Sequence, residues 1–297
     1  MNIRTLLRES AEKLMQAGCD APRLDAELLL MHLCSCSRTD LIIRANDKLT
    51  ELVQAHFSSL LQRRIKREPL AYIIGEKEFW SRAFYVNPDV LVPRPETEHL
   101  IEAVLTCLPD PQQHYHFCDI GTGSGCIAIT LAAEYPQTIV TAMDISAASL
   151  KIAQRNAATL NVTARIRWHQ GDMLQPLTAE DGLFDIIISN PPYVTASEMY
   201  ELEPELSLEP RHALTDESNG LKFLTTILQN APVYLKQGGY IIVETGSCGL
   251  PSTPPTLILK QEIYDLAGLL RGAIYQHADL PFKTLRLGCR NSSLMRV

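Results

Sequence analysis

The sequence predicts an α/β protein in which a mostly parallel sheet, covered by helices on both faces, follows a small helical domain. From about residue 96, short apolar runs rich in β-branched residues alternate with helical segments, as in doubly wound sheets. Two polar motifs directly follow such runs, at residues 119–125 and 190–193. The start of the chain instead has helical leucine spacing. We therefore predict a helical domain at 1–75, a β-hairpin linker at 76–95 and an α/β domain at 96–297.

The N-terminal domain is predicted to contain three helices. The first carries leucines from Leu6 to Leu14 and ends near Gly18, the second opens at Pro22, and the third runs from a Thr50 cap to about Lys66. The segment carries no catalytic constellation. A substrate-recognition domain and a stabilising extension are the two interpretations, and we favour recognition.

A dense basic cluster lies at the end of the third predicted helix. It consists of Arg63, Arg64, Lys66 and Arg67. A solvated helix face is the default interpretation, and a docking patch for an acidic or RNA-bound partner is the alternative. In the linker that follows, Phe79, Trp80, Phe84, Tyr85 and Val86 suit a β-hairpin in which most of these side chains serve packing.

Five strands are predicted in the α/β domain, at residues 117–120, 139–143, 166–169, 184–189 and 239–244. A helix from Cys126 to about Glu134, stopped by Pro136, connects the first two. In such sheets ligands bind outside the carboxyl ends of the strands, where the strand order reverses. We expect the first and fourth strands to be neighbours there, so that the two motifs face one crevice.

The first motif is a glycine-rich turn, Gly121-Thr122-Gly123-Ser124-Gly125, which follows Asp119-Ile120. Its glycines permit positive φ and close approach to a ligand. The spacing is neither that of a dinucleotide fingerprint nor that of a P-loop. Asp144 ends the next strand about 20 residues later, where a carboxylate can meet ribose hydroxyls. Nucleoside binding and a purely structural turn, with Asp144 as a turn or cap residue, both remain open.

The second motif is Asn190-Pro191-Pro192-Tyr193, at the end of the fourth strand. Two prolines remove two backbone donors, so the Asn190 side-chain oxygen and nearby carbonyls are left as acceptors. Tyr193 adds an aromatic face. Two acceptors beside a flat ring suit a planar –NH2 group.

Together, residues 119–125, Asp144 and residues 190–193 resemble class I S-adenosylmethionine-dependent methyltransferases that act on planar amino or amide nitrogens. The segments at 64–80 (RIKREPLAYIIGEKEFW) and 91–98 (LVPRPETE) narrow the resemblance to the protein-(glutamine-N5) methyltransferases of peptide chain release factors. The resemblance covers about residues 1–244.

The resemblance implies methyl transfer from S-adenosylmethionine to the glutamine of a Gly-Gly-Gln motif, with S-adenosylhomocysteine as product. Release factors would be the protein substrate, gripped by the helical domain. The implied catalytic residues are Asn190, Pro191, Pro192 and Tyr193. The implied cofactor-binding residues are Asp119, Gly121, Thr122, Gly123, Ser124, Gly125, Asp144, Asp172, Met173 and Asn190.

Some residues depart from the family pattern. Met173 stands where an aromatic residue is common, and Asp172 beside it either accepts from the adenine amino group or caps a turn. Glu217 stands where glycine is usual. After Glu244 the pattern fades, and we expect the last fifty residues to be rearranged or poorly ordered, with residues 282–287 as only part of the usual antiparallel strand pair.

Two other functions remain open. One is a nucleic-acid amino methyltransferase, for example of adenine, since the second motif fits an exocyclic amine equally well and the base would have to be flipped out. The other is a binding module that keeps the donor site but has lost catalysis through its altered C-terminus.

The composition and charge of the chain restrict its expected partners, cofactors and compartment. The chain has 297 residues, a net charge of −7 and 46% hydrophobic residues, so we expect a large core and no direct contact with nucleic acid. Its eight cysteines form no C-x-x-C pair, so we expect a reducing cytoplasm and no metal. Arg4, Arg8 and Glu9 interrupt any early apolar stretch, so we expect no signal peptide. We also expect no membrane span, and a monomer.

Overall fold

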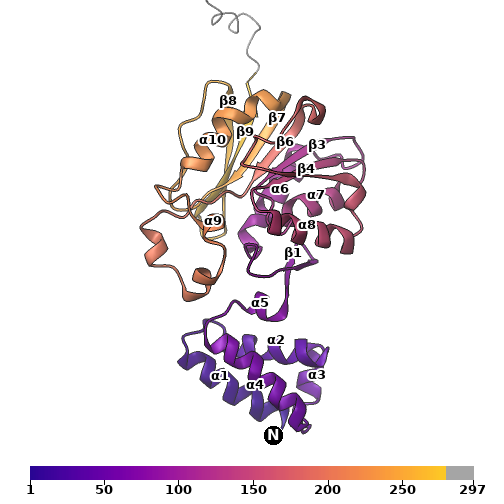
Figure 1. Cartoon of the computed structure of the whole chain (residues 1–297), viewed down its shortest axis with the longest axis vertical. Helices are drawn as coiled ribbons and strands as arrows, with labels where there is room; N and C mark the ends of the chain where they lie inside the picture. Colours follow the sequence, from indigo (N-terminus) through magenta and orange to yellow (C-terminus); the bar gives the residue numbers. More distant parts are fainter. Residues whose placement is uncertain (279–297) are drawn as a thin grey trace, which may run out of the picture.

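The computed structural model describes residues 1–278, in which a small helical domain is joined to a larger α/β domain (Figure 1). The helical domain contains α1 (Ile3–Gln16), α2 (Pro22–Cys34), α3 (Arg38–Ile43), α4 (Glu51–Ile65) and α5 (Leu70–Ile74). Buried leucines of α1, α2 and α4 share one core. These are the three predicted helices. The sequence does not reveal α3 and α5, because helices of six and five residues are too short to show a periodic pattern.

Local signals at the helix ends act as predicted. The Thr50 hydroxyl accepts a hydrogen bond from the Val53 amide at 3.3 Å and so caps α4. Pro22 is the first residue of α2. Gly18 follows α1 with a φ of +78°, a conformation that a glycine adopts without a steric penalty.

The predicted hairpin links the two domains. Strands β1 (Glu76–Phe79) and β2 (Arg82–Tyr85) are antiparallel. Phe79 and Phe84 are fully buried in the core of the α/β domain, and this confirms their expected packing role. The hairpin is therefore anchored to the α/β domain rather than to the helical one.

The α/β domain is built on a seven-stranded sheet within the described residues. Its strands are β3 (His116–Ile120), β4 (Ile139–Asp144), β5 (Ile166–Gln170), β6 (Phe184–Ser189), β7 (Leu235–Glu244), β8 (Leu257–Tyr264) and β9 (Leu270–His277). Their order is β5-β4-β3-β6-β7-β9-β8. The first five in this order are parallel. As predicted, the first and fourth predicted strands, β3 and β6, are neighbours, and the strand order reverses between them.

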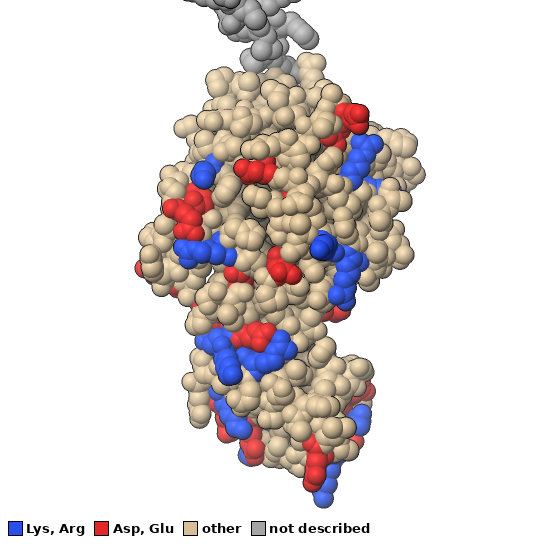
Figure 2. All heavy atoms as spheres, viewed as in Figure 1, with Lys and Arg blue, Asp and Glu red and all other residues tan. Residues whose placement is uncertain are grey.

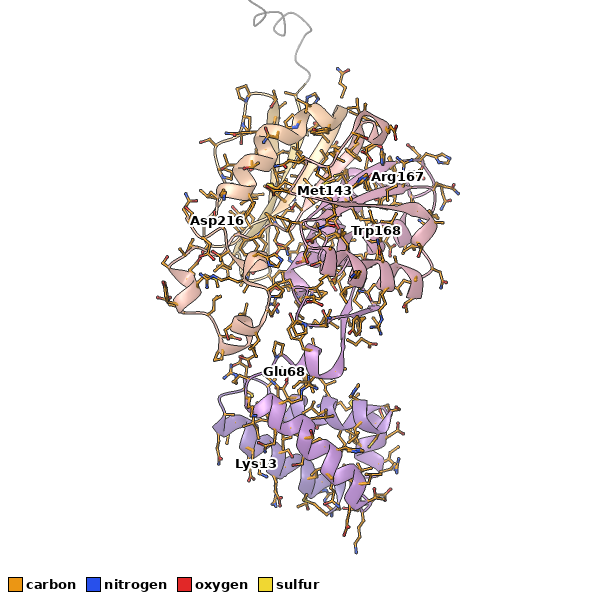
Figure 3. The ribbon with its side chains drawn as sticks, in the orientation of Figure 1. Lys13, Glu68, Met143, Arg167, Trp168 and Asp216 are labelled. Atoms are coloured by element: carbon orange, nitrogen blue, oxygen red, sulfur yellow. The ribbon has the colours of Figure 1, made fainter. Side chains whose placement is uncertain are left out.

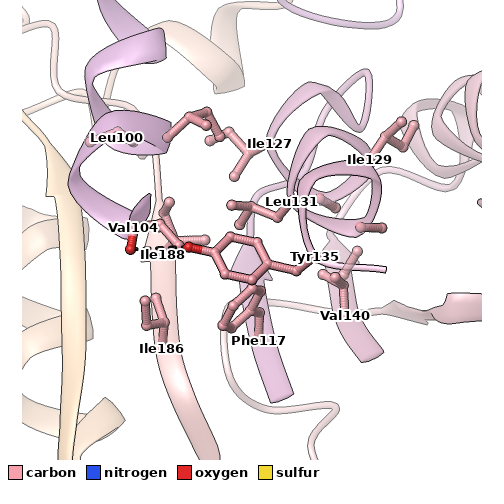
Figure 4. Packing of buried hydrophobic residues seen from close by; sticks show 14 of the residues in the cluster. Leu100, Val104, Phe117, Ile127, Ile129, Leu131, Tyr135, Val140, Ile186 and Ile188 are labelled. Carbon is pink, nitrogen blue, oxygen red and sulfur yellow. Dashed lines mark hydrogen bonds between the residues drawn. The ribbon is translucent and has the colours of Figure 1, made fainter. Parts of the chain in front are cut away.

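Helices cover both faces of this sheet (Figure 1). They are α6 (Glu98–Cys107), α7 (Cys126–Glu134), α8 (Ala147–Thr159), the short α9 (Arg211–Leu214) and α10 (Lys222–Asn230). Alternate strand residues enter opposite cores: Ile186 and Ile188 pack with α6 and α7, and Ile187 packs with α10. Tyr135 fills the centre of the first core against Phe117 (Figure 4). Burial on both faces explains why these strands read as continuous apolar runs.

The C-terminal edge of the sheet corrects one expectation. Strand β9 pairs antiparallel with β7, and β8 pairs antiparallel with β9, so residues 257–277 complete the sheet where a rearrangement was expected. Strand β8 lies at the edge of the sheet and shows no alternation of buried and exposed positions: five consecutive residues, from Ile258 to Glu262, are exposed. The expected partial strand at 282–287 lies outside the described residues.

The basic cluster proves to be a contact between the domains. Arg64 is buried and donates to Asp25 at 2.7 Å and to Glu205 at 2.7 Å. Arg67 also donates to Glu205, at 2.6 Å. Basic and acidic side chains accordingly meet where the two domains join (Figure 2). A solvated helix face is therefore the wrong interpretation for Arg64, because a guanidinium at this depth requires acidic partners.

Arg63 belongs to the same junction. It pairs with Glu68, the acid labelled at the junction in Figure 3, at 2.8 Å from its Nε atom. Lys66 alone among the four basic residues is exposed.

Two features are absent from the part of the chain that the structure describes. No helix there combines the length and the apolar character that crossing a bilayer requires. In the same residues, no group of three or more His, Cys, Asp or Glu side chains is arranged to hold a metal ion.

Candidate active site

The glycine turn after β3 uses its three glycines in two ways. Gly121, Gly123 and Gly125 have φ values of +72°, +54° and +83°, a region that other residues rarely adopt. A Cβ atom on Gly121 or Gly123 would meet no atom within 4 Å, whereas one on Gly125 would lie 2.7 Å from Ile129. The first two glycines therefore leave open space for a ligand, and the third permits close packing of α7.

Asp119 holds this turn from below. It is fully buried, and its Oδ2 atom accepts from the Thr122 hydroxyl at 2.6 Å and from the Ala128 amide at 3.2 Å. Burial raises the pKa of Asp119 to about 7. Asp119, Thr122, Ser124 and Gly125 do not line the cavity beside the turn, so in this structure they shape the turn from behind.

Asn156 of α8 ties the turn to the hairpin, and sequence reasoning missed it. Its Nδ2 atom donates to the Ser124 carbonyl at 2.9 Å and to the Tyr85 carbonyl at 3.0 Å, and its Oδ1 atom accepts from the Tyr85 amide at 2.8 Å. No motif points to this residue, because its role exists only once the hairpin has docked.

Asp144 faces the same turn from the end of β4. Its Oδ2 atom accepts from the Gly123 amide at 2.8 Å and its Oδ1 atom accepts from the Ser146 amide at 2.9 Å. Ser146, not Asp144, caps α8. Burial raises the pKa of Asp144. The side chain also lines the cavity. Asp144 therefore both holds the turn and faces the cavity, two roles that the sequence left as alternatives.

The cavity has a volume of about 300 Å³ and lies at the carboxyl ends of the parallel strands, the site expected for ligands in such sheets. Met143, labelled in Figure 3, forms part of its wall. Of the residues predicted to bind the cofactor, those that line it are Gly121, Gly123, Asp144, Asp172, Met173 and Asn190. Val90 from the linker and His212 and Phe223 from the segment before β7 also line it and were not predicted.

Asn190 presents an acceptor to this cavity. Its Nδ2 atom donates to the Thr97 hydroxyl at 3.1 Å. No donor among residues 1–278 bonds its Oδ1 atom, and Asn190, Pro191 and Pro192 all line the cavity. The motif and the glycine turn therefore share one wall, as the strand order predicts. Thr97 lies in the 91–98 segment, whose resemblance to the family was the available signal for it.

Tyr193 is held behind the prolines. Its hydroxyl donates to Glu244 Oε1 at 2.8 Å, and burial raises its pKa. A Cβ atom on Gly246 would lie 2.8 Å from the Tyr193 ring, so a larger residue cannot occupy that position without movement. The ring does not line the cavity, and its stacking role stays a prediction.

The segment from Glu209 to Lys222 closes the cavity from the side. Buried Glu209 accepts from the Val92 amide at 3.0 Å and from Arg94 at 2.6 Å. Asp216, labelled in Figure 3, accepts from the amides of Gly220 and Lys222, both at 3.0 Å. These acids order a segment that has little regular secondary structure of its own.

The backbone at Glu217 explains why glycine is usual at this position. Its φ is +58°, a value at which glycine avoids the steric cost that other residues bear. The side chain pairs with Arg211 at 2.6 Å. An exposed pair of this kind contributes little to stability, so the strain is not fully offset.

Comparison with known proteins identifies the family. Residues 5–75 match the PrmC N-terminal domain, and residues 99–220 match the methyltransferase small domain. A release factor glutamine methyltransferase of Neisseria gonorrhoeae is 41% identical over 76% of this chain and 81% of that protein. Another, of Nitratidesulfovibrio vulgaris, is 42% identical over 82% of each chain. A bifunctional methyltransferase of Rickettsia typhi is 40% identical over 82% of this chain, which spans about half of that longer protein. The resemblance drawn from the motifs is confirmed, and the chain belongs to the release factor glutamine methyltransferase family.

Proposed function

We propose that this protein transfers a methyl group from S-adenosylmethionine to the side-chain amide nitrogen of the glutamine in the Gly-Gly-Gln motif of peptide chain release factors. The observation that carries the proposal is the unbonded Oδ1 atom of Asn190 on the wall that the glycine turn also lines. The names of the relatives that are 41% and 42% identical support it.

The residues around the cavity fit the donor. The open space above Gly121 and Gly123 admits close approach of its amino-acid portion to the backbone. Asp144 lies where its carboxylate can accept from the ribose hydroxyls. Asp172 and Met173 both line the cavity. We infer that Asp172 accepts from the adenine amino group and that Met173 offers a polarisable contact for the ring. The donor brings an electron-poor sulfonium whose methyl group is open to attack.

Asn190 and the Pro191 carbonyl would receive the glutamine amide. Each accepts one N–H of the substrate, and this holds the nitrogen in line with the methyl group. Fixed orientation of this kind contributes up to ~7–11 kcal/mol in favourable systems. Both hydrogen bonds strengthen as positive charge develops on the nitrogen, so they stabilise the transition state more than the bound substrate.

The transfer is a direct displacement. The nitrogen lone pair forms the new N–C bond while the S–C bond to the methyl group breaks, and its electron pair stays on sulfur. S-adenosylhomocysteine and a cationic amide nitrogen result. The nitrogen then loses a proton to solvent, and this leaves N5-methylglutamine.

The helical domain would recognise the release factor. Ile42 and Ile43 at the end of α3 are 71% and 76% exposed, and Leu52 at the start of α4 is 66% exposed. Three large apolar side chains on adjoining elements are typical of a protein contact. They lie at a distance from the cavity, so they would bind a region of the substrate other than the glutamine.

Methylation of purified release factor tests the proposal. Wild-type protein is incubated with methyl-labelled S-adenosylmethionine and either intact release factor, a release factor with Asn in place of the motif glutamine, or DNA. We expect label only in the intact release factor, on the glutamine nitrogen. Label in the Asn-bearing factor or in DNA, or no label in the intact factor, would contradict the proposal.

A further inference from the structure

We propose that Asn156 is a positioning residue for donor binding, which fixes the interdomain linker against the glycine turn and so sets the shape of the cavity. Asn156 belongs to α8 and is 1% exposed. It does not line the cavity, so it acts on the donor only through the residues that it holds. The inference rests on the proposed function, since it concerns the donor site of that reaction.

The Asn156 side chain hydrogen-bonds to the turn and to the linker at the same time. Its Nδ2 atom donates to the Ser124 carbonyl at 2.9 Å and to the Tyr85 carbonyl at 3.0 Å. Its Oδ1 atom accepts from the Tyr85 amide at 2.8 Å. A reversed amide would place an oxygen against two carbonyl oxygens, so only this orientation satisfies all three groups. Asn156 therefore pairs with Tyr85 as a neighbouring strand would, while it also holds Ser124.

On the side of the turn, α8 packs closely against the backbone. A Cβ atom on Gly125 would lie 3.0 Å from the Cβ atom of Ala153, which precedes Asn156 by about one helical turn on the same face. Gly121 and Gly123 belong to the same glycine turn and line the cavity. Ala153 and Asn156 together therefore fix the turn whose first two glycines form part of the cavity wall.

On the side of the linker, α8 makes a second polar contact near its start. The Ser149 hydroxyl donates to the Asp89 carbonyl at 3.0 Å. Ser149 and Asn156 lie two helical turns apart and share one face of α8. Between them, Ile152 is buried in one apolar cluster with Val90. Asp89 and Val90 line the cavity, so the same face of α8 fixes a second part of its wall.

The hydrogen bonds make this contact more specific than apolar packing. Apolar burial is non-directional, so by itself it would let α8 and the linker shift relative to each other. The hydrogen bonds of Asn156 restrict the contact to one arrangement. Arg155 adds to it, because its Cζ atom lies 3.4 Å from the centroid of the Tyr85 ring. Loss of Asn156 should let two parts of the cavity wall move apart, and the donor would lose contacts to both.

Asn156→Leu is the first test. The variant keeps a side chain of similar size but removes the hydrogen bonds to Ser124 and Tyr85. We expect the Kd for S-adenosylmethionine, measured by calorimetry, to rise about tenfold, within the roughly 5- to 150-fold range of coupling between separate sites. The methylation rate at saturating donor should stay within about threefold of wild type, because Asn190 is held by Thr97 and not by α8. A weaker donor affinity with a preserved rate is not expected of a residue that serves stability alone.

Tyr135→Phe is the matched control. The Tyr135 hydroxyl is buried and donates to the Leu108 carbonyl at 2.7 Å, just beyond the C-terminal end of α7. Its loss also removes a buried hydrogen bond from the α/β domain, but it should leave the donor affinity at the wild-type value. Both variants are compared at a temperature at which circular dichroism shows them folded. A wild-type donor affinity in folded Asn156→Leu would overturn the proposal, and so would an equal loss of affinity in Tyr135→Phe.

Amide hydrogen exchange in the wild-type protein tests the same contact without a substitution. If the donor binds best when Asn156 holds the linker, then the bound donor must favour that arrangement in return. Saturating S-adenosylhomocysteine should therefore slow exchange of the Tyr85 amide several-fold more than exchange of the Tyr135 amide, which bonds to the Leu131 carbonyl at the end of α7. Equal slowing of the two amides, or none, would overturn the positioning role even if Asn156→Leu does not fold.

Calorimetry and hydrogen exchange need no release factor, and this separates the inference from the proposed function. A wild-type protein that binds the donor but labels no release factor would contradict the proposed function and leave the Asn156 comparison decisive. A folded Asn156→Leu protein with wild-type donor affinity would contradict this inference alone. A wild-type protein that binds no donor would overturn both.

Discussion

The Arg64 guanidinium donates a hydrogen bond to Glu205 at 2.7 Å, although 141 residues separate them in the sequence. Arg64 belongs to the helical domain, and Glu205 belongs to the segment that continues to the cavity wall at His212. The side chains are 8% and 13% exposed. This buried ion pair therefore sets how the helical domain sits relative to the candidate active site.

Glu205→Ala should destabilise the protein. Arg64 and Arg67 both lose an acceptor, and an unsatisfied buried donor costs about 1–3 kcal/mol. Urea unfolding measures the loss. Glu203→Ala, an exposed acid two residues away, is the control and should leave the free energy of unfolding unchanged. Equal stabilities of the two variants would show that the ion pair contributes nothing.

The same pair predicts a pH dependence. Burial alone would raise the pKa of Glu205, but hydrogen bonds from Arg67 and Arg64 hold it below its ordinary value. An acid with a depressed pKa contributes stability above its unfolded pKa and loses it as the pH falls through the folded pKa. The difference between wild type and Glu205→Ala should thus vanish in strongly acidic buffer. A difference that persists there would contradict the assignment.

Asp144→Ala should weaken S-adenosylmethionine binding. Each ribose hydroxyl that loses a charged acceptor costs roughly 1.5–3 kcal/mol. Because burial raises the pKa of Asp144, donor affinity should begin to fall at a pH above that at which an ordinary Asp is protonated. Calorimetry checks both. Asp185→Asn, at the opposite end of the sheet, is the control and should keep the wild-type donor affinity. Unchanged donor affinity in a folded Asp144→Ala protein would refute the ribose role.

Asn190→Ala should lower kcat far more than donor affinity. Loss of one preorganised partner costs on the order of 100- to 1000-fold in comparable sites. Asn190→Asp keeps an acceptor but loses the donor to Thr97, so its rate should lie between those of Ala and wild type if acceptance dominates. Single-turnover methylation compares them, with exposed Asn230→Ala as control. A near-wild-type rate for Asn190→Ala would mean that the acceptor site is misassigned.

Replacing Ile42 and Ile43 together with Ser should raise KM for intact release factor by about tenfold or more. Large anchors at protein contacts often account for over 1 kcal/mol each. Both side chains are exposed, so the free energy of unfolding and the affinity for the donor should be unchanged. Leu266→Ser, a fully exposed apolar residue near β9, is the control. An unchanged KM would remove this surface from the recognition site.

Glu217→Gly should raise the melting temperature by a small amount. Its positive φ suits glycine, and the exposed pair with Arg211 that is lost contributes little. Glu217→Ala, which keeps the strain and also loses the pair, is the matched control and should not be stabilised. Thermal unfolding of the two variants decides, and a less stable Gly variant would show that the ion pair outweighs the strain.

Local patterns in the sequence determined the elements that position the donor site. Strands β3, β4 and β6 are recognisable because burial on both faces makes each of them a mostly apolar run. The glycines at 121, 123 and 125 follow from the φ values that the turn requires. The end of the sheet could not be predicted, because the edge strand β8 exposes five consecutive residues and so lacks the alternating pattern of a half-buried strand.

Tertiary structure alone decided how distant polar groups combine. A sequence shows Arg64 as one of several basic residues, and only folding places it between Asp25 and Glu205. Tyr193 and Glu244 likewise form their hydrogen bond only because folding places β6 beside β7. Such contacts depend on the positions of side chains far apart in the chain. Periodicity and propensity report only a residue's own neighbourhood, so they cannot reveal them.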